Sequence, residues 1–196
     1  MKNIVIIGTS GAIGRALKNQ LSNAYPKASI FAFSSNKDVQ LKNSLHHHSI
    51  NYESENSIMD AAQIASAHMP IDMIIIATGT LHSQNIMPEK SIKDLNFNSL
   101  TEIYKRNTVL PAIIAKHFLP KMHRKQKIIF AVLSARVGSI SDNNLGGWYA
   151  YRMSKTALNM LIKNLSIETK RYNKEAIIVG LHPGTVDSTL SKPFQR

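Results

Sequence analysis

The feature that most constrains the fold is the way the chain begins. Residues 3–7, Asn-Ile-Val-Ile-Ile, form a short and mostly β-branched apolar run, which is typical of a strand buried on both faces. A glycine-rich segment, Gly8–Gly14, follows at once, and the sequence after it predicts a helix over about 14–24. A buried strand joined to a helix by so short a turn indicates a sheet whose parallel strands are covered by helices.

The same alternation continues along the chain. Further strands are predicted at 29–33, 48–52, 73–77, 127–133 and 176–181. Helical patterns occupy the stretches near 57–68, 91–123 and 150–171. We therefore predict an α/β fold of the Rossmann type, a doubly wound parallel sheet with helices on both faces.

Composition sets the scale of this fold. The 196 residues, 43% of them hydrophobic, suffice for one well-buried domain, so we expect a single domain over 1–196. The longest apolar runs, Ile4–Ile7 and Met73–Ala77, are too short to span a membrane, and the N-terminus shows no signal-peptide pattern. We expect a soluble, cytoplasmic protein without a membrane contact.

The positive charge and the run of histidines raise the question of a nucleic-acid partner and of a metal site. The net charge is +12, with one basic cluster at Lys121, Arg124, Lys125 and Lys127, but no nucleic-acid-binding motif accompanies it. A solvated basic surface that also attracts an anionic dinucleotide explains the charge more simply. His46-His47-His48 alternate in direction if they lie on a strand, and the chain has no cysteine. We predict neither a nucleic-acid partner nor a metal site.

The glycine-rich segment has the chemistry of a dinucleotide turn. Residues without a Cβ let the chain turn tightly and let a pyrophosphate approach the backbone N–H groups. The positive end of the following helix then faces the phosphates. The residues predicted to bind the cofactor here are Gly8, Ser10, Gly11, Ala12, Ile13 and Gly14.

The end of the second strand indicates which nicotinamide is bound. An acidic residue at this point usually binds the ribose 2′-hydroxyl, but here the strand ends in Ser34, Ser35, Asn36 and Lys37, and no carboxylate occurs before Asp38. Hydroxyls and a nearby cation suit a 2′-phosphate better, so we predict NADP and leave NAD open. Asn51 and Tyr52, at the end of the third strand, are expected to flank the adenine.

A phenol and an ammonium group are four residues apart on a predicted helix. Tyr151 and Lys155 therefore share one helix face. Carbonyl reduction needs a proton donor beside the oxygen that gains negative charge. A tyrosine with a pKa near ~10 is a poor acid or base at neutral pH, and a nearby lysine cation is expected to lower that pKa.

These motifs together resemble the short-chain dehydrogenase/reductase family over nearly the whole chain. The stretch from Leu133 to Leu161, with Gly-Ser-Ile and Trp-Tyr-Ala-Tyr-Arg-Met-Ser-Lys, looks closest to the C-factor-like branch. The turn resembles the family's Gly-x-x-x-Gly-x-Gly form, with Ala12 at the place of the middle glycine.

The resemblance implies roles for further residues. Asn107 matches a helix asparagine that holds a water in a proton relay to the lysine. Ala77-Thr78-Gly79 lies where the family has Asn-Ala-Gly. Pro183 and Gly184 match the turn that faces the nicotinamide, where Val186 would contact the carboxamide through its backbone.

The serine that orients the substrate is less certain from the pattern. The family places it three residues before a glycine. Counting back from Gly138 gives Ala135, with Ser134 one place earlier. Ser139, twelve residues before Tyr151, is the alternative. We predict Ser134, because it emerges directly from the strand.

The resemblance implies an NADP(H)-dependent oxidoreductase that acts on a carbonyl or alcohol substrate. Tyr151 would be its general acid/base, Lys155 would bind the nicotinamide ribose, and Ser134 would hold the substrate oxygen. A catalytically weak NAD(P)-binding signalling or sensing protein resembling C-factor is the alternative. A homodimer or homotetramer formed through the helices near 91–123 and 150–171 is also implied.

The resemblance further predicts that the C-terminal part of the fold is incomplete. Family members continue after the Pro-Gly turn with a segment that covers the substrate, another helix and a final strand, whereas this sequence ends at Arg196. We expect the last helix and strand to be missing and the sheet edge after the sixth strand to be open.

Overall fold

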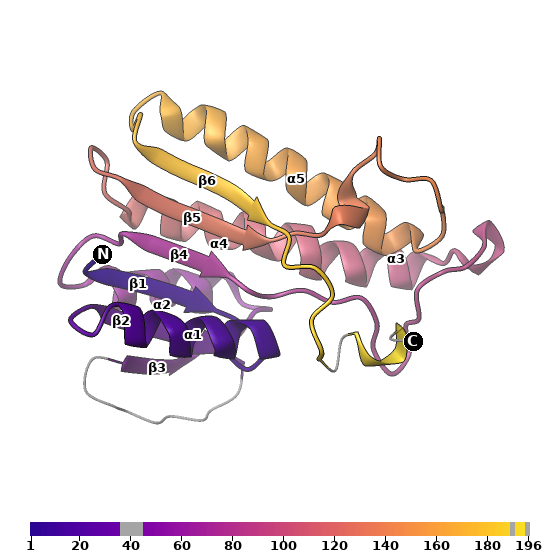
Figure 1. Ribbon diagram of the computed structural model, residues 1–196, viewed down its shortest axis with the longest axis horizontal. Helices are drawn as coiled ribbons and strands as arrows, with labels where there is room; N and C mark the ends of the chain where they lie inside the picture. The colour runs from indigo at the N-terminus through magenta and orange to yellow at the C-terminus, as the bar shows by residue number, and fades with distance from the viewer. Residues whose placement is uncertain (36–44, 189–190, 195–196) are drawn as a thin grey trace.

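The computed structural model describes residues 1–35, 45–188 and 191–194. Six parallel strands form one sheet in the order β3-β2-β1-β4-β5-β6 (Figure 1). The strands are β1 (Asn3–Ile7), β2 (Ser29–Ser34), β3 (Leu45–Ser49), β4 (Met73–Ile76), β5 (Ile128–Leu133) and β6 (Ala176–Leu181). The predicted Rossmann-type fold is confirmed.

The strand order reverses between β1 and β4. From β1 the chain builds outward to β3, and it then crosses back to add β4 on the other side of β1. In open parallel sheets, ligands bind outside the carboxyl ends of the strands at such a reversal. The fold therefore places the candidate site beyond Ile7 and Ile76, the last residues of these two neighbouring strands.

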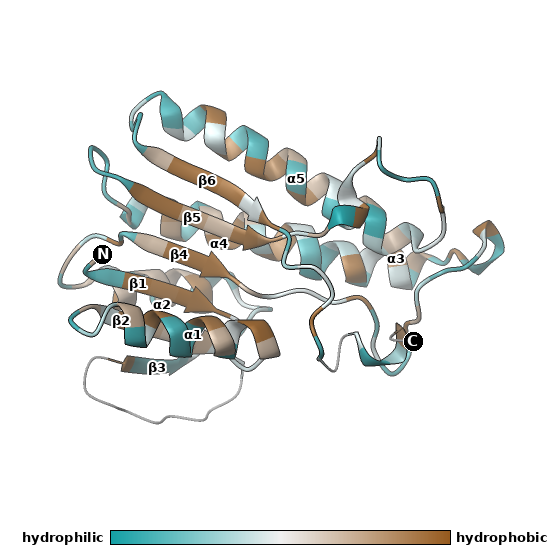
Figure 2. Ribbon diagram, in the orientation of Figure 1, coloured by the Kyte–Doolittle hydropathy of each residue, from teal (hydrophilic) through white to brown (hydrophobic). Residues whose placement is uncertain are grey.

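Helices cover both faces of the sheet. One face of the core packs α1 (Ala12–Ala24) against β1, β2 and β4. The other face packs α2 (Glu55–Ser66), α4 (Leu110–Phe118) and α5 (Tyr149–Lys170) against the strands, and α3 (Phe97–Tyr104) precedes α4. Figure 2 shows the hydrophobic colour concentrated on the central strands, while α1 and α5 alternate between hydrophobic and hydrophilic residues. This pattern agrees with strands buried on both faces.

Some predicted boundaries were wrong. The third strand runs over Leu45–Ser49, three residues earlier than 48–52, because it pairs with β2 in the register Phe31↔His46 and Phe33↔His48. His46 and His48 both stack on Phe31, with ring centroids 4.8 and 6.1 Å apart. β3 is an edge strand of the described sheet, and no group of three potential metal ligands occurs among the described residues.

The helical stretch predicted near 91–123 consists of several pieces. A short 3₁₀ turn, Ile92–Asp94, precedes α3, and a wide π turn over Lys105–Val109 joins α3 to α4. Pro111 lies in the first turn of α4, which continues from the π turn, and its missing N–H leaves a carbonyl of that turn without a helical donor. The π turn shifts the helix register at Asn107, a residue of the candidate site.

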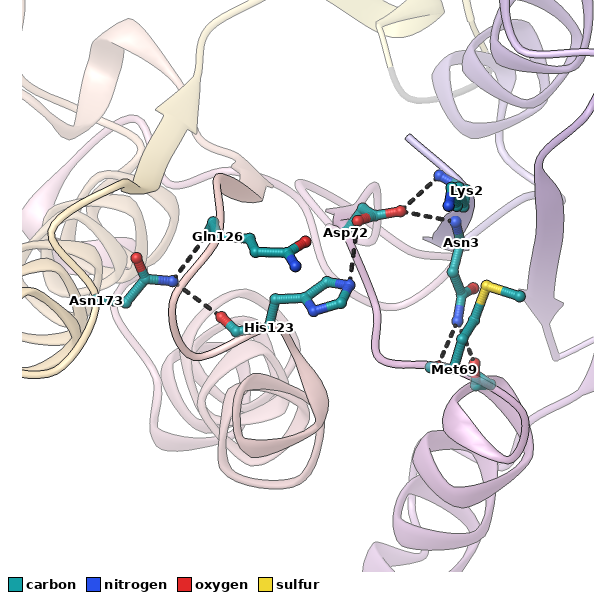
Figure 3. Close-up of polar contacts among 8 residues, drawn as sticks. Lys2, Asn3, Met69, Asp72, His123, Gln126 and Asn173 are labelled. Carbon is teal, nitrogen blue, oxygen red and sulfur yellow. Dashed lines mark hydrogen bonds and ion pairs between the residues drawn. The ribbon is translucent and has the colours of Figure 1, made fainter.

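At the amino-terminal edge of the sheet, polar side chains tie the loops together (Figure 3). The carboxylate of Asp72, just before β4, accepts hydrogen bonds from the backbone N–H groups of Lys2 and Asn3 at 2.5 and 2.9 Å. The amide of Asn3 donates to the carbonyl of Ala65 in the last turn of α2 and to that of Met69 just after this helix. Asn173, before β6, donates to the carbonyls of His123 and Gln126, both at 2.9 Å. These contacts join segments far apart in sequence.

Within the described part of the chain, none of the helices combines the length and the apolar character needed to cross a membrane.

Candidate functional site

The turn after β1 is built by close contacts between backbone segments. Gly8 has a φ of +94°, and its N–H donates to the carbonyl of Phe33 at 2.8 Å. A Cβ on Gly8 would lie 2.9 Å from the carbonyl carbon of Ala77, and one on Gly14 would lie 2.2 Å from the Gly8 oxygen. Both positions therefore require glycine. Gly11 differs, because a Cβ there would make only an ordinary contact at 3.5 Å.

The N-terminus of α1 is open for an anion. Its N-cap residue, Gly11, is extended and provides no side-chain cap, and the first turn contains no acidic residue. Ser10 and Gly11 are exposed. Ala12 begins the helix, where a methyl group is compatible with helical geometry, so the departure from the family's middle glycine leaves the turn intact. The positive end of the helix suits a pyrophosphate.

The residues expected around the adenine and its ribose lie in different environments. Ser34, the last residue of β2, is half-buried, and Asn51 is exposed, with its side chain accepting from Glu53 N at 3.0 Å. The ring of Tyr52 packs against the main hydrophobic core. Burial raises the pKa of Tyr52 to about 12, against a smaller lowering by the nearby backbone of Gly8. Lys37 and Asp38 lie outside the described residues.

Asn107 joins three parts of the site. It is 1% exposed, and its side chain makes two hydrogen bonds of 2.8 Å to the backbone of Thr80, one to the N–H and one to the carbonyl. Its Nδ2 also donates to the Ser154 hydroxyl at 3.0 Å. The π turn therefore fastens the segment after β4 to α5 directly beside Lys155.

Lys155 lies between the end of β5, the segment after β4 and the ring of Tyr151. The Lys155 Nζ donates to the Leu133 carbonyl at 2.8 Å and lies 5.8 Å from the centroid of the Tyr151 ring. A Cβ on Gly79 would lie 3.5 Å from both Lys155 Nζ and Asn107 Oδ1. The structure thus brings together Tyr151, Lys155, Asn107 and Gly79, four of the predicted residues, from three segments of the chain.

The pKa shift of Tyr151 differs from the one that its spacing from Lys155 predicted. Burial raises the pKa of Tyr151, and burial lowers the pKa of Lys155 to about 8. The expected lowering of the tyrosine pKa by the lysine is therefore wrong for the free chain, because the desolvation of the phenol dominates. Tyr151 stays protonated at neutral pH, which is the form that a proton donor needs.

The segment before Gly79 contributes mainly backbone. Ala77 N donates to the Ile7 carbonyl at 2.7 Å, which extends the pairing of β1 and β4 beyond the strands. The hydroxyl of Thr78 is buried and has no hydrogen-bond partner in the described part of the chain. This unused polar atom lies in the segment that contacts Gly8, between the dinucleotide turn and Lys155.

The two candidate serines have other partners. The Ser134 hydroxyl donates to Asn159 Oδ1 at 2.6 Å, one helical turn beyond Lys155 on α5. The Ser139 hydroxyl lies 3.3 Å from that of Ser141 and accepts from Asp142 N at 3.4 Å. Neither hydroxyl is bonded to Tyr151 or Lys155 in the described structure. The assignment of Ser134 stays a prediction that requires its hydroxyl to leave Asn159.

The segment after β6 returns to the site. Pro183 and Gly184 are exposed, Gly184 has a φ of +76°, and the Val186 carbonyl accepts from the Ser191 hydroxyl at 2.5 Å. Farther along, the ring of Phe194 lies 5.1 Å from that of Trp148. Figure 1 shows this segment crossing back below the ends of β4 and β6.

Sequence reasoning missed three parts of this arrangement. Phe194 also contacts His82, with ring centroids 5.6 Å apart, and the Trp148 ring lies 6.3 Å from the Tyr151 ring. A Cβ on Gly138 would lie 2.8 Å from the backbone of Lys155, so this glycine seats the loop after β5 on α5. Glu89 is a buried carboxylate beside the start of α5. Of these residues, only Gly138 could have been found from the sequence, through its spacing from the candidate serines.

Comparison with known proteins agrees with this geometry. The family model described as short chain dehydrogenase matches residues 2–196. The 1-hydroxy-2-glutathionyl-2-methyl-3-butene dehydrogenase of Rhodococcus sp. (strain AD45) is 23% identical over 195 residues, which cover 99% of this chain and 82% of that protein. C-signal of Myxococcus xanthus is 30% identical over 103 residues, which cover 53% of this chain and 61% of that protein.

Solved structures share the fold. The NADPH-bound carbonyl reductase from chicken fatty liver superposes with a TM-score of 0.82 at 22% identity, and the match covers 97% of this chain and 78% of that one. The match to the family model over almost every residue, together with the dinucleotide turn and the Tyr151–Lys155 pair, shows that this chain belongs to the short chain dehydrogenase family of oxidoreductases.

Proposed function

We propose that this protein is an NADP(H)-dependent oxidoreductase that transfers hydride between the nicotinamide and a carbonyl or alcohol substrate, with Tyr151 as general acid/base. The observation that carries the proposal is the approach of Lys155 and Asn107 to Gly79, with the Tyr151 ring centroid 5.8 Å from Lys155 Nζ, at the point where the strand order reverses. A proton donor, a cation and a backbone turn without side-chain bulk meet there, next to the open N-terminus of α1.

The described residues fit a nicotinamide dinucleotide. Gly8 and Gly14 leave room for close backbone approach, α1 offers an uncapped terminus, and the buried hydroxyl of Thr78 lacks a partner. When bound, the cofactor supplies or accepts the hydride. The likeness to a carbonyl reductase solved with NADPH supports NADP(H) as the cofactor. We propose that the cofactor also contacts the remaining residues predicted to bind it, namely Ser34, Asn51, Tyr52, Ala77, Pro183, Gly184 and Val186.

The chain's own residues then have distinct tasks. Tyr151 donates its proton to the carbonyl oxygen as negative charge develops there, and takes a proton back in the reverse reaction. Lys155, mostly protonated at pH 7 with a pKa of about 8, stabilises that charge and binds the nicotinamide ribose. Asn107 holds the segment around Thr80 and links Lys155 to water. Ser134 orients the oxygen once its hydroxyl has left Asn159.

Two measurements test the proposal. Fluorescence titration with NADPH and with NADH measures binding, and NADPH oxidation over a panel of aldehydes and ketones measures turnover. We expect tighter binding of NADPH and turnover that falls by about 10²–10⁴-fold in Tyr151→Phe, with NADPH affinity unchanged. Equal turnover in the wild type and Tyr151→Phe contradicts the assignment of Tyr151, and the absence of dinucleotide binding contradicts the proposal as a whole.

A second candidate function has its own support. The likeness to C-signal and the engagement of the Ser134 hydroxyl by Asn159 favour a catalytically weak NAD(P)-binding protein that signals or senses through its dinucleotide. Binding of NADPH without turnover of any carbonyl in the panel would favour this second function.

We also propose a homodimer or homotetramer. Apolar side chains lie exposed on the helices where the family resemblance places the interface, namely Phe97, Tyr104, Val109, Met153, Met160 and Ile167. Burying such side chains between subunits removes apolar surface from water.

A further inference from the structure

Glu89 is a buried carboxylate for which the proposed reaction has no task. It lies in the segment between β4 and α3 and is only 3% exposed. Its Oε2 accepts a hydrogen bond from the backbone N–H of Ala150 at 3.2 Å, whereas its Oε1 is buried without a partner among the described residues. A buried carboxylate with an unpaired oxygen reduces stability, so we expect the other contacts of Glu89 to offset this cost.

The start of α5 requires a cap that its own sequence does not provide. The N-cap residue, Trp148, is in the left-handed conformation with φ of 50° and ψ of 43°, and its side chain makes no capping hydrogen bond. Serine, threonine, aspartate and asparagine normally fill this role. Glu89 supplies the acceptor from a distant segment, and its negative charge faces the positive end of a helix of 22 residues.

The backbone of Glu89 also holds the turn before the helix. Gly146, Gly147 and Trp148 have consecutive positive φ values of 64°, 63° and 50°. Trp148 N donates to the Glu89 carbonyl at 2.6 Å, and a Cβ on Gly147 would lie 3.3 Å from that same oxygen. The turn therefore packs directly against the backbone of Glu89.

Tyr151 comes immediately after the residue that Glu89 binds. Its ring packs in a small hydrophobic cluster with Ile86, Ile103 and Ala150, and Ile86 belongs to the same segment as Glu89. The segment before α3 thus contributes Ile86 to the cluster that packs against Tyr151, and it contacts the start of α5 through Glu89.

We propose that Glu89 is a positioning residue for Tyr151: its carboxylate holds the first turn of α5, and its backbone holds Trp148 beside the phenol. The inference rests on the proposed function, because it assigns Glu89 to the placement of the proposed acid/base. Glu89 acts through Ala150 and Trp148 and does not touch the reacting atoms.

The test compares Glu89→Ala and Glu89→Gln with Glu168→Ala, a matched control at the exposed far end of α5. Turnover of the carbonyl substrate, KM for NADPH and hydrogen exchange of the α5 amides are measured for each. We expect Glu89→Ala to lower kcat about tenfold, the size of a lost helix cap, with KM for NADPH within about twofold. Exchange should quicken in the first turn of α5 alone.

Glu89→Gln keeps an oxygen for Ala150 N, so we expect it to retain kcat within about threefold. A wild-type kcat in Glu89→Ala, or a loss of kcat accompanied by an equal rise in KM, would overturn the inference. If Glu89→Ala does not fold, Glu89→Asp, whose shorter side chain withdraws the acceptor, must show the same loss of kcat; a wild-type kcat there overturns it.

The outcomes separate this inference from the proposed function. Equal turnover in the wild type and Tyr151→Phe removes Tyr151 as the acid/base of the proposed function, and hydrogen exchange still shows whether Glu89 holds the first turn. Unchanged exchange in Glu89→Ala removes the positioning role even where Tyr151 is essential.

Discussion

At the amino-terminal edge of the sheet, the side chains of Asp72, Asn3 and Asn173 bind the loops, whereas at the carboxyl-terminal edge Gly8 and Gly14 bring backbone segments together without any side chain. Both edges join segments that are distant in sequence. At the amino-terminal edge, the Asp72 carboxylate and the Asn3 and Asn173 amide groups bond to backbone groups, and only Asn3 Oδ1 among these side chains is buried without a partner in the described part of the chain.

At the carboxyl-terminal edge, some hydrogen-bonding groups have no partner within the described residues. The α1 terminus has no side-chain cap, and the buried hydroxyl of Thr78 lacks a partner among the described residues. Such groups reduce stability unless a ligand satisfies them. We therefore expect the amino-terminal edge to contribute mainly to stability and the carboxyl-terminal edge mainly to cofactor binding, so that substitutions at the two edges have separable effects on stability and on activity.

The largest effect is expected at the glycine contact of the carboxyl-terminal edge. A Cβ on Gly14 would lie 2.2 Å from the Gly8 oxygen, so Gly14→Ala must displace the turn. We expect NADPH affinity to fall about a hundredfold, equivalent to about 3 kcal/mol, as measured by fluorescence titration. Asn19→Ala, at an exposed position on the same helix and outside the turn, is the control and should bind normally. Similar affinities in the two variants would show that the close contact does not shape the site.

At the opposite edge, Asn173→Ala should affect stability alone. It removes two hydrogen bonds to carbonyls and one accepted from Glu175 N, all at a buried position. We expect a loss of about 2–3 kcal/mol in the free energy of unfolding, measured by urea denaturation, with kcat/KM unchanged. Asn164→Ala, on the exposed side of α5, is the control. A loss of activity in folded Asn173→Ala would break the separation of the two edges.

The carboxyl-terminal edge should also determine the pH dependence. Because burial lowers the pKa of Lys155 to about 8, its positive charge is lost as the pH rises through 8 instead of near 10.5. Carbonyl reduction should then fall about tenfold per pH unit above this value, while Tyr151 remains protonated. In Lys155→Arg the charge persists, so the remaining activity should stay constant over this range. A rate independent of pH up to 10 in the wild type would contradict the role of the lysine charge.

The smallest effect is expected at Ser134. Its hydroxyl must give up a hydrogen bond of 2.6 Å to Asn159 before it can hold a substrate oxygen, so its net contribution is reduced. We expect Ser134→Ala to lower kcat/KM less than tenfold, and Ser139→Ala to leave it unchanged. A larger loss in Ser139→Ala than in Ser134→Ala would reverse the assignment of the orienting serine.

Local patterns were sufficient to predict much of the fold and part of the site. The buried strands and the turn at Gly8–Gly14 depend on neighbouring residues, and they occur where periodicity and glycine spacing predicted them. The spacing of Tyr151 and Lys155 on one helix also predicted their common face. The position of β3 did not follow from the pattern, because His46 and His48 occupy a strand through stacking on Phe31.

The sequence by itself determined the parallel sheet, the dinucleotide turn and the Tyr151–Lys155 pair, since hydrophobic periodicity and glycine positions act over short distances. Only the tertiary structure decided what surrounds the pair. The cap of α5 by Glu89, the direction of the Ser134 hydroxyl and the raised pKa of Tyr151 depend on contacts between distant segments and on burial. Such contacts leave no periodic signal, because they arise from the packing of the whole sheet.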